Sequence, residues 1–544
     1  MSHSRSPDPL VGAGQAMGDP EAYPLLRHLV ELAPTNLEDP VHHRWEKPHY
    51  LAAARYLADV ATKWGLRARI FDPVAELPNA DSFHGVPRPN VIVDLDVGGT
   101  DRIIVMSHYD VVPVPAEQLA RWKSPPHELT FREDGRFYGR GAADDLGSGV
   151  VPSLMAAKQL REDPKLRRNL RLLICCDEET GGAGGIEALK AHDEQLPAGD
   201  PGRFLDADVA LIPDGDPHAT AGSSGLLFLD GTFAQPVPLS RVLAYGGALI
   251  SLRTVAENWR SVYPSPDWPD HGAPAPVITG RATVTKWDVK EEATKLSDRP
   301  RVAAIHAETD ATNQIGQSVT MVFRGPSTSL GTLRAQLASL LSPPFRLESG
   351  GATSLTVPSD ALALSVVGTS AHAGYPHRGH NPVPPTVAFL DRALHEGILD
   401  DTGRYSATFG VDLRLIPEMQ LETGHDDALG YVHRWIAAHD PEARIEAPAD
   451  RSRGGYAIPP DHPALKKLER ILSSVFGAHG IYGEYGGTDA SSLVGLRTSV
   501  GLPLPALVFG LMNRTSHIHE AEENLDPAGI ARVTETIRRY VLEP

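Results

Sequence analysis

The chain has 544 residues, 41% of them hydrophobic, so it is long enough for two domains or for one domain with a large insertion. Its 69 acidic residues outnumber its 51 basic residues, and the net charge of −18 disfavours nucleic acid or an anionic membrane as partner, because both need a clustered basic surface. The first twenty residues lack the apolar segment of a signal peptide, and no run of about eighteen residues is apolar throughout, so we expect a soluble cytoplasmic protein.

Helices and strands alternate in the first part of the chain. Apolar residues at helical spacing predict helices, and short apolar runs between them predict strands. This alternation is typical of an α/β fold with a mostly parallel sheet flanked by helices, in which ligands bind at the carboxyl ends of the strands. The predicted helices are 21–33, 49–65, 149–160 and 184–192, and the predicted strands are 90–97, 102–108, 169–176 and 208–214.

The pattern changes near residue 218, where stretches rich in Pro, Gly and Ser interrupt shorter strand and helix patterns. The earlier alternation resumes near residue 454. We therefore expect a catalytic domain formed by residues 1–217 and 453–544, split in sequence by an inserted α+β domain of residues 218–452.

Two cysteines, Cys175 and Cys176, are adjacent within the predicted strand 169–176. Neighbouring side chains of a strand point to opposite faces, so we interpret them as core residues and not as a disulfide or a zinc cluster.

Residue types that bind metal ions follow each predicted strand of the outer domain. His108 and Asp110 are two positions apart, so both side chains leave the same face of an extended backbone and could bind one ion together. Any one such pair also occurs at ordinary turns and helix starts, but repetition at five strand ends favours one shared metal site. The candidates are His108 and Asp110, Asp144 and Asp145, Glu178 and Glu179, Asp214, and His517 and His519.

Three consecutive carboxylates, Asp177, Glu178 and Glu179, come directly after an apolar run. They need a positive partner, because adjacent like charges repel and cannot stay ionised in an apolar setting. The candidate ligands are imidazoles and carboxylates without thiolates, which suits zinc, manganese or cobalt. Because there are more carboxylates than one tetrahedral ion needs, we expect two divalent ions, most simply zinc, with a bridging carboxylate; this metal pair is the expected positive partner.

The motifs around these residues resemble a known family, the co-catalytic dizinc hydrolases that include aminoacylase, carnosinase, carboxypeptidase G, succinyl-diaminopimelate desuccinylase and bacterial cytosolic dipeptidases. The matching motifs follow the family's order over nearly the whole chain. They are SHYDVVP, GRGAADDLGSG, DEETGG, PDG, SAHAGYPHRGHNPV, VDLRLIP, GGTDAS and HEAEEN. The resemblance implies a zinc-peptidase-like catalytic domain with an inserted lid domain and hydrolysis of an amide bond.

The resemblance also implies roles for single residues. Asp110 resembles the residue that orients His108 through its second ring nitrogen, and Glu178 resembles the general base. The implied metal ligands are His108 and Asp214 for one ion, Glu179 and His519 for the other, and Asp144 as the bridge between them.

Two ambiguities that spacing leaves open are resolved by the resemblance. His519, and not His517, is followed four positions later by a glutamate, Glu523, as in the family. Asp144, and not Asp145, aligns with the aspartate that family members retain when they have only one.

Other positions concern the surroundings of the ligands. The family commonly has a cis peptide after the bridging aspartate, here Asp144. The sequence departs from the family at Leu146, where a lysine is usual, and at Glu522, where an asparagine is usual. These departures concern the surroundings of the ligands more than the ligands themselves.

Substrate-binding residues are expected mainly in the inserted domain. His372 resembles the histidine that stabilises the developing oxyanion, and Arg414 resembles the clamp for a substrate carboxylate. Asn381, Gly487 and Thr488 are further predicted substrate contacts. Because the metal ligands lie in the outer domain, we expect the two domains to close on each other during catalysis.

The expected substrates are dipeptides or small peptides. The length of the insertion and the EETGG and PDGDP motifs resemble the bacterial dipeptidases, which favours a monomer; a carnosinase-like homodimer remains open. An N-acyl amino acid amidohydrolase would share the metals and the base. A non-catalytic metal-containing binding protein would not need Glu178, and a calcium-stabilised structural domain would not need His108 and His519.

Overall fold

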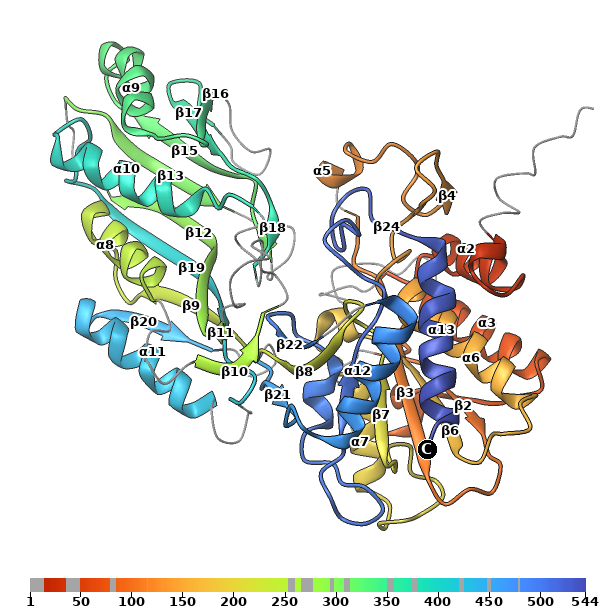
Figure 1. The fold of residues 1–544 in the computed structure, drawn as a ribbon. Helices are drawn as coiled ribbons and strands as arrows, with labels where there is room; N and C mark the ends of the chain where they lie inside the picture. The colour runs from red at the N-terminus through yellow and green to blue at the C-terminus, as the bar shows by residue number, and fades with distance from the viewer. Residues whose placement is uncertain are drawn as a thin grey trace, which may run out of the picture. The chain divides into compact units, whose positions relative to one another are not determined.

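The computed structural model divides the chain into two compact units (Figure 1). Unit 1 comprises Met1–Ser223, Ala457–Gly483 and Thr488–Pro544, and unit 2 comprises Ser224–Tyr456 and Glu484–Gly487. Their identification with the expected catalytic and lid domains stays a prediction. The structure describes residues 14–35, 49–78, 85–114, 116–252, 260–265, 277–293, 298–307, 314–349, 357–373, 379–419, 425–447, 452–477 and 480–544.

Unit 1 is built on a mixed sheet with the strand order β1-β2-β6-β3-β7-β23-β8, with β21 and β22 beyond β8. The predicted parallel arrangement is confirmed for the four central strands, since β6, β3, β7 and β23 run parallel to their neighbours in this row. The flanking pairs β1–β2, β2–β6 and β23–β8 are antiparallel. The bounds are β1 Arg67–Phe71, β2 Asn90–Leu95, β3 Arg102–His108, β6 Asn169–Cys175, β7 Val209–Ile212, β8 Ala219–Ser223, β21 Tyr456–Ala457, β22 Ile481–Glu484 and β23 Ala506–Val508.

Helices pack against this sheet, which explains why its central strands are apolar. Six consecutive residues of β3 and of β6 are buried without polar alternation, as expected for strands covered on both faces. Helices α2, α6, α12 and α13 pack on one another, and α3 packs against β1 and β2. The bounds are α2 Ala22–Leu32, α3 His49–Lys63, α4 Pro73–Glu76, α5 Ala116–Leu119, α6 Val151–Arg161, α7 Ile186–Glu194, α12 Pro463–Phe476 and α13 Pro527–Leu542.

Short elements near the carboxyl ends of the strands shape the loops of unit 1. A single π-helical turn, η2, leads into α6, and 3-10 turns follow β6 and precede β23. A small sheet joins the region before η2 to the loop before α13. The bounds are η2 Leu146–Val150, η3 Glu178–Thr180, η6 Asp489–Leu493, β4 Thr130–Phe131, β5 Phe137–Tyr138 and β24 Asn524–Leu525.

Unit 2 contains an eight-stranded sheet with the order β16-β17-β15-β13-β12-β19-β9-β20. Neighbouring strands of this sheet are antiparallel throughout, and helices α8, α9, α10 and α11 belong to the same unit (Figure 1). The sheet strands are β9 Leu226–Phe233, β12 Arg281–Ala293, β13 Arg301–Ala307, β15 Ser318–Arg324, β16 Arg346–Ser349, β17 Leu362–Val367, β19 Arg404–Arg414 and β20 Ala443–Glu446. The helices are α8 Leu239–Ile250, α9 Ser327–Leu340, α10 Val383–His395 and α11 His425–His439, and two further strand pairs are β10 Arg260–Pro264 with β11 Val277–Thr279 and β14 Gln314–Ile315 with β18 Ala371–His372.

One hydrophobic cluster runs between this sheet and its helices. Along β19, the residues from Arg404 to Phe409 alternate between exposed and buried, which is the pattern of a sheet covered on one face. Trp287 is fully buried and stacks on Phe409 with ring centroids 5.8 Å apart. Unit 2 therefore has its own core.

Among the described residues, no helix combines the length and the apolar composition that crossing a bilayer requires.

Candidate metal centre

The central parallel strands of unit 1 bring distant segments of the chain to one edge of the sheet. His108 is the last residue of β3, Glu179 lies in η3 directly after β6, and Asp214 follows β7 by two positions. Asp144 lies in the turn before η2, and His519 lies in the loop between β23 and β24. The five predicted ligands thus come from five separate segments.

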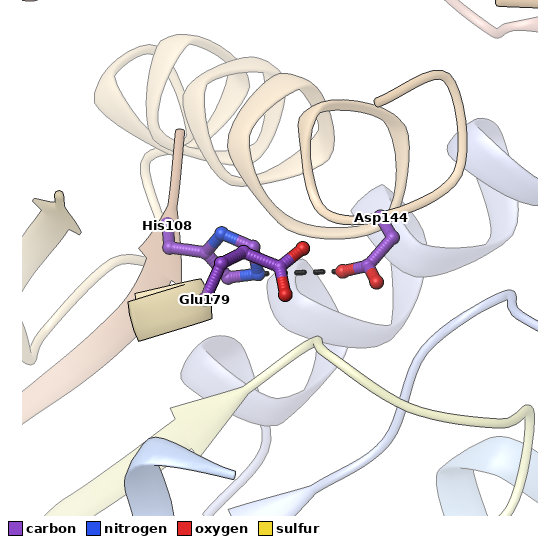
Figure 2. Close-up of side chains that lie close together, drawn as sticks. All are labelled: His108, Asp144 and Glu179. Atoms are coloured by element: carbon purple, nitrogen blue, oxygen red, sulfur yellow. Dashed lines mark ion pairs between the residues drawn. The ribbon is translucent and has the colours of Figure 1, made fainter. Parts of the chain in front are cut away.

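Asp144 stands between two imidazoles. Its Oδ1 atom lies 3.3 Å from Nε2 of His108, and its Oδ2 atom lies 3.0 Å from Nε2 of His519. The same nitrogen of His519 lies 2.9 Å from Oε1 of Glu179. Figure 2 shows His108, Asp144 and Glu179 converging, and one ligand atom from each lies within 4.8 Å of those of the other two. One carboxylate with an imidazole at each oxygen is the arrangement of a bridging ligand.

Asp214 belongs to the same electrostatic environment. Burial raises the pKa of its carboxyl group well above the ordinary value, and the negative charges of Asp144, Glu178 and Glu179 raise it further. Burial also raises the pKa of Asp145 well above the ordinary value, and the charge of Asp214 raises it further. These carboxylates therefore crowd one another.

The titration of the other ligands reflects the same crowding. Burial alone would lower the pKa of His108 and His519, but the neighbouring carboxylates outweigh it and raise both well above the ordinary histidine value. The two imidazoles together hold the pKa of Asp144 well below its usual range against the effect of burial. Burial raises the pKa of Glu179 to about 7 although His519 opposes this.

These residues fit divalent metal ions by the chemistry of their donor atoms. Imidazole nitrogens and carboxylate oxygens suit zinc, manganese or cobalt, and buried carboxylates whose pKa is raised by like charges favour a cation among them. His517 lies apart from this group, since it is exposed and its nearest acidic partner is Glu520 at 3.6 Å.

Asp110 supports the site without joining the ligand group. Its carboxylate lies 3.4 Å from Nδ1 of His108, and its backbone oxygen lies 3.0 Å from the same nitrogen. Its two carboxylate oxygens accept the backbone N–H groups of Glu178 and Glu179 at 3.1 and 3.2 Å. Asp110 is fully buried, so one carboxylate fixes the turn that carries the expected base and a ligand.

Asp177 corrects the expectation that metal ions balance all three consecutive carboxylates. Its carboxylate forms a buried ion pair with Arg88 at 2.7 Å, and burial raises its pKa to about 6. The residue adopts the left-handed backbone conformation, with φ 59°, which is uncommon for a residue other than glycine. The arginine lies 89 positions away in sequence, so no local pattern indicated it.

The turn around Asp144 is held by backbone hydrogen bonds. The Asp144–Asp145 peptide bond is cis, as the resemblance implied. Oδ2 of Asp145 accepts the backbone N–H of His108 at 3.1 Å, which ties this turn to the end of β3. Leu146, at the position where the family usually has lysine, is fully buried. Glu522, at the other departure, forms an ion pair with Arg132.

The family model described as peptidase family M20/M25/M40 matches residues 104–543, which is most of the chain. The chain belongs to this family. A cysteinylglycine-S-conjugate dipeptidase of Corynebacterium striatum is 37% identical over 480 residues, covering 85% of this chain and 84% of that protein. An uncharacterized metallohydrolase of Methanococcus maripaludis is 33% identical over 144 residues, but the match covers only 26% of this chain and 32% of that protein.

Solved structures share the fold. The dipeptidase Dug1p of Saccharomyces cerevisiae aligns with a TM-score of 0.56 at 14% identity, covering 100% of this chain and 98% of that one. The structural overlap indicates a common fold, in agreement with the architecture expected from the motifs. At 14% identity it indicates the fold alone.

Arg414, the predicted carboxylate clamp of this M20-family chain, is already engaged within unit 2. Its Nε and Nη2 atoms donate to the two carboxylate oxygens of Asp412 at 2.7 and 2.8 Å, and Nη1 donates to the backbone oxygen of Tyr485 at 3.0 Å. Both members of the ion pair are almost completely buried. Two N–H groups of the guanidinium are left for another partner, so a role as clamp stays a prediction.

The remaining predicted substrate residues lie at loop and strand ends. His372 is in β18, and its backbone pairs with Gln314 of β14; its side chain lies outside the described residues. Asn381 donates to the backbone oxygen of Val284 and accepts the N–H of Val383, so it stabilises the start of α10. Gly487 is exposed in unit 2, whereas Thr488 is buried in unit 1 and caps η6. Their contact with substrate stays a prediction.

Proposed function

We propose that this M20-family chain hydrolyses the amide bond of dipeptides or small peptides with two divalent metal ions, most simply zinc. The observation that carries the proposal is the Asp144 carboxylate, whose two oxygens each lie next to a different imidazole, His108 and His519. His108 and Asp214 would hold one ion, Glu179 and His519 the other, and Asp144 would bridge the two.

Bound divalent ions would lower the pKa of a water molecule toward neutrality and polarise the scissile carbonyl. Glu178 would take the proton from this water and deliver it to the departing amine. The hydrogen bond from its backbone N–H to Asp110 would hold the base in place. Asp110 would also keep the Nδ1 side of His108 occupied, so that Nε2 faces the ligand group.

The dipeptide specificity is supported by the relative from Corynebacterium striatum, a cysteinylglycine-S-conjugate dipeptidase. The match to this chain covers 84% of that protein. Peptides of cysteinylglycine whose sulfur carries a substituent are therefore the first substrates to try. His372 would stabilise the oxyanion, and Arg414, Asn381, Gly487 and Thr488 would contact the substrate. The cytoplasmic location and the choice between monomer and homodimer stay predictions.

The test is hydrolysis of a panel by the zinc-loaded protein, with and without chelator. The panel contains cysteinylglycine S-conjugates, other dipeptides and N-acyl amino acids. We expect turnover of dipeptides that stops with chelator and returns with zinc. Preference for N-acyl amino acids would instead identify an amidohydrolase, and zinc binding without turnover of any amide would favour a non-catalytic binding protein.

The role of His372 has its own test. We expect His372→Ala to lower kcat and leave the zinc content unchanged. Loss of zinc would show that His372 is a ligand and would contradict the assigned ligand set.

A further inference from the structure

Two loops that carry metal ligands lie far apart in the sequence of unit 1 and are tied together by one side chain. The turn that leads to Asp144 and the loop that carries His519 are separated by more than 370 positions. Both ligands must keep a fixed distance if the carboxylate of Asp144 is to serve two ions. Residues that are not themselves predicted ligands fix that distance.

Glu523 joins the two loops by accepting backbone hydrogen bonds. It follows His519 by four positions, and its Oε1 atom accepts the N–H groups of Ala143 and Asp144 at 3.0 and 3.1 Å. Its Oε2 atom accepts the N–H of Gly141 at 3.1 Å. The carboxylate is 1% exposed, so it holds the turn of Asp144 from inside the protein.

Arg140 neutralises Glu523 and reaches the backbone of His519 through a second residue. Its Nη1 atom donates to Oε2 of Glu523 at 2.7 Å, and its Nη2 atom donates to Oε1 of Gln118 at 2.5 Å. Nε2 of Gln118 in turn donates to the backbone oxygen of His519 at 2.7 Å. His519 has the left-handed backbone conformation, with φ 62°, so this bond holds a residue that would otherwise relax.

The burial of Arg140 indicates that it serves geometry more than stability. The side chain is 1% exposed, and its Nε atom has no hydrogen-bond partner among the described residues. Buried ion pairs are often no more stable than apolar pairs of the same size, and a buried unpaired donor destabilises the folded state. What the guanidinium provides is a planar fork that sets the angle between two partners, which lysine lacks.

We propose that Arg140 is a positioning residue of the metal centre, which through Glu523 fixes the backbone of Asp144 and through Gln118 fixes the backbone of His519. The inference rests on the proposed metal centre, but it concerns metal affinity and so does not depend on the substrate. The hydrogen bonds of the Arg140 guanidinium go to Glu523 and Gln118 and not to the side chains of the predicted ligands.

The test measures zinc affinity by competition with a chromophoric chelator. Arg140→Lys keeps the charge near Glu523 but cannot reach Gln118 at the same time, and we expect zinc affinity to fall about 10- to 100-fold, the range for residues that orient ligands. Arg171→Lys is the matched control, because Arg171 is a similarly buried arginine of unit 1 paired with Asp94 at 2.6 Å. We expect that control to keep the affinity of the unmodified protein.

A second variant keeps the inference testable if Arg140→Lys does not fold. Gln118→Met removes the bond to the backbone oxygen of His519 and the bond from Arg140 but keeps the Arg140–Glu523 pair, and we expect it to weaken one of two zinc-binding steps and to change the visible spectrum of the cobalt-loaded protein. An unchanged affinity in Arg140→Lys, an unchanged affinity and cobalt spectrum in Gln118→Met, or an equal loss of affinity in Arg171→Lys would overturn the role of Arg140.

The outcome is separable from that of the proposed function. A protein that binds zinc, responds to Arg140→Lys and hydrolyses no amide would retain the role of Arg140 and lose the proposed activity. If the protein hydrolyses peptides and Arg140→Lys leaves its zinc affinity unchanged, the proposed activity stands and the proposed role of Arg140 is wrong.

Discussion

The two units bury charge in different ways. In unit 1, Asp144, Asp145, Glu179 and Asp214 are crowded at the ends of parallel strands, and burial with mutual repulsion raises the pKa of all but Asp144. In unit 2, the buried Asp412 is neutralised by Arg414 two positions away. Unit 1 also contains paired buried charges, Arg88 with Asp177 and Arg140 with Glu523, so its crowded carboxylates are an exception within it and indicate a site for cations.

The largest effect expected from this contrast concerns Glu178. Glu178→Ala should lower kcat about a thousandfold, because a general base contributes roughly 10²–10⁴ to the rate, and should leave the zinc content unchanged. Steady-state kinetics and elemental analysis of the same sample would measure both. Near-normal turnover with zinc present would remove Glu178 from the mechanism.

In unit 2, the next largest effect should come from a change in core packing. Trp287→Ala removes the largest fully buried side chain of that unit and should cost about 3–5 kcal/mol in its unfolding free energy. Zinc affinity should stay as in the unmodified protein, because the predicted ligands belong to unit 1. Denaturant unfolding and the zinc competition assay would check this. A large change in zinc affinity would break the contrast between the units.

A smaller effect should appear in the metal-free protein. The pKa of Asp214 is raised in the folded state, so folded protein binds more protons than unfolded protein and loses stability as pH rises above the unfolded value near 3.8. In chelator at pH 8, Asp214→Asn should therefore melt at a higher temperature than the unmodified protein. With saturating zinc the order should reverse, since a predicted ligand is missing. Melting curves in chelator and in zinc test this prediction. A lower melting temperature of the variant in chelator would contradict the repulsion between Asp214 and the neighbouring carboxylates.

The smallest effect concerns a charge of unit 1 far from the ligands. Burial and the charges of Arg168 and Arg470 lower the pKa of Lys467 to about 8. Between about pH 8 and 10 the folded state binds fewer protons at this lysine than the unfolded state, so stability should rise with pH. Because Lys467 is only half-buried, the gain should be small. Comparison of melting temperatures with Lys467→Met across this range should show the rise only in the unmodified protein; parallel curves would contradict it.

The sequence allowed much of unit 1 to be predicted, because its elements have strong local patterns. The predicted strand 102–108 coincides with β3, and the predicted helix 149–160 corresponds to α6 after a π-helical turn. The antiparallel flanks of the sheet were not expected, since apolar periodicity gives no strand direction. The grouping of His108 and Glu179 could be anticipated because each lies at the end of a strand in the same sheet, whereas Asp144 and His519 lie in loops whose place only the motifs indicated.

Partners of buried charges could not be predicted in the same way. The pairing of Asp177 with Arg88, and of Glu523 with Arg140 and Gln118, joins residues from separate loops that no spacing rule connects. Arg414 was expected to be available for a substrate, whereas its neighbour Asp412 uses two of its nitrogen atoms. The contacts of Asp177 and Glu523 depend on which loops meet after the strands pair, whereas Asp412 and Arg414 lie two positions apart on one face of β19.

By itself the sequence determined the strand and helix segments of unit 1 and the residue types able to bind metal ions, because apolar periodicity and ligand chemistry are local properties of the chain. Only the tertiary structure decided that His108 and His519 face opposite oxygens of Asp144, and that Arg88 and not a metal ion balances Asp177. The physical reason is that a buried charge is stabilised by whatever lies within a few ångströms, and sheet pairing, not sequence distance, sets those neighbours.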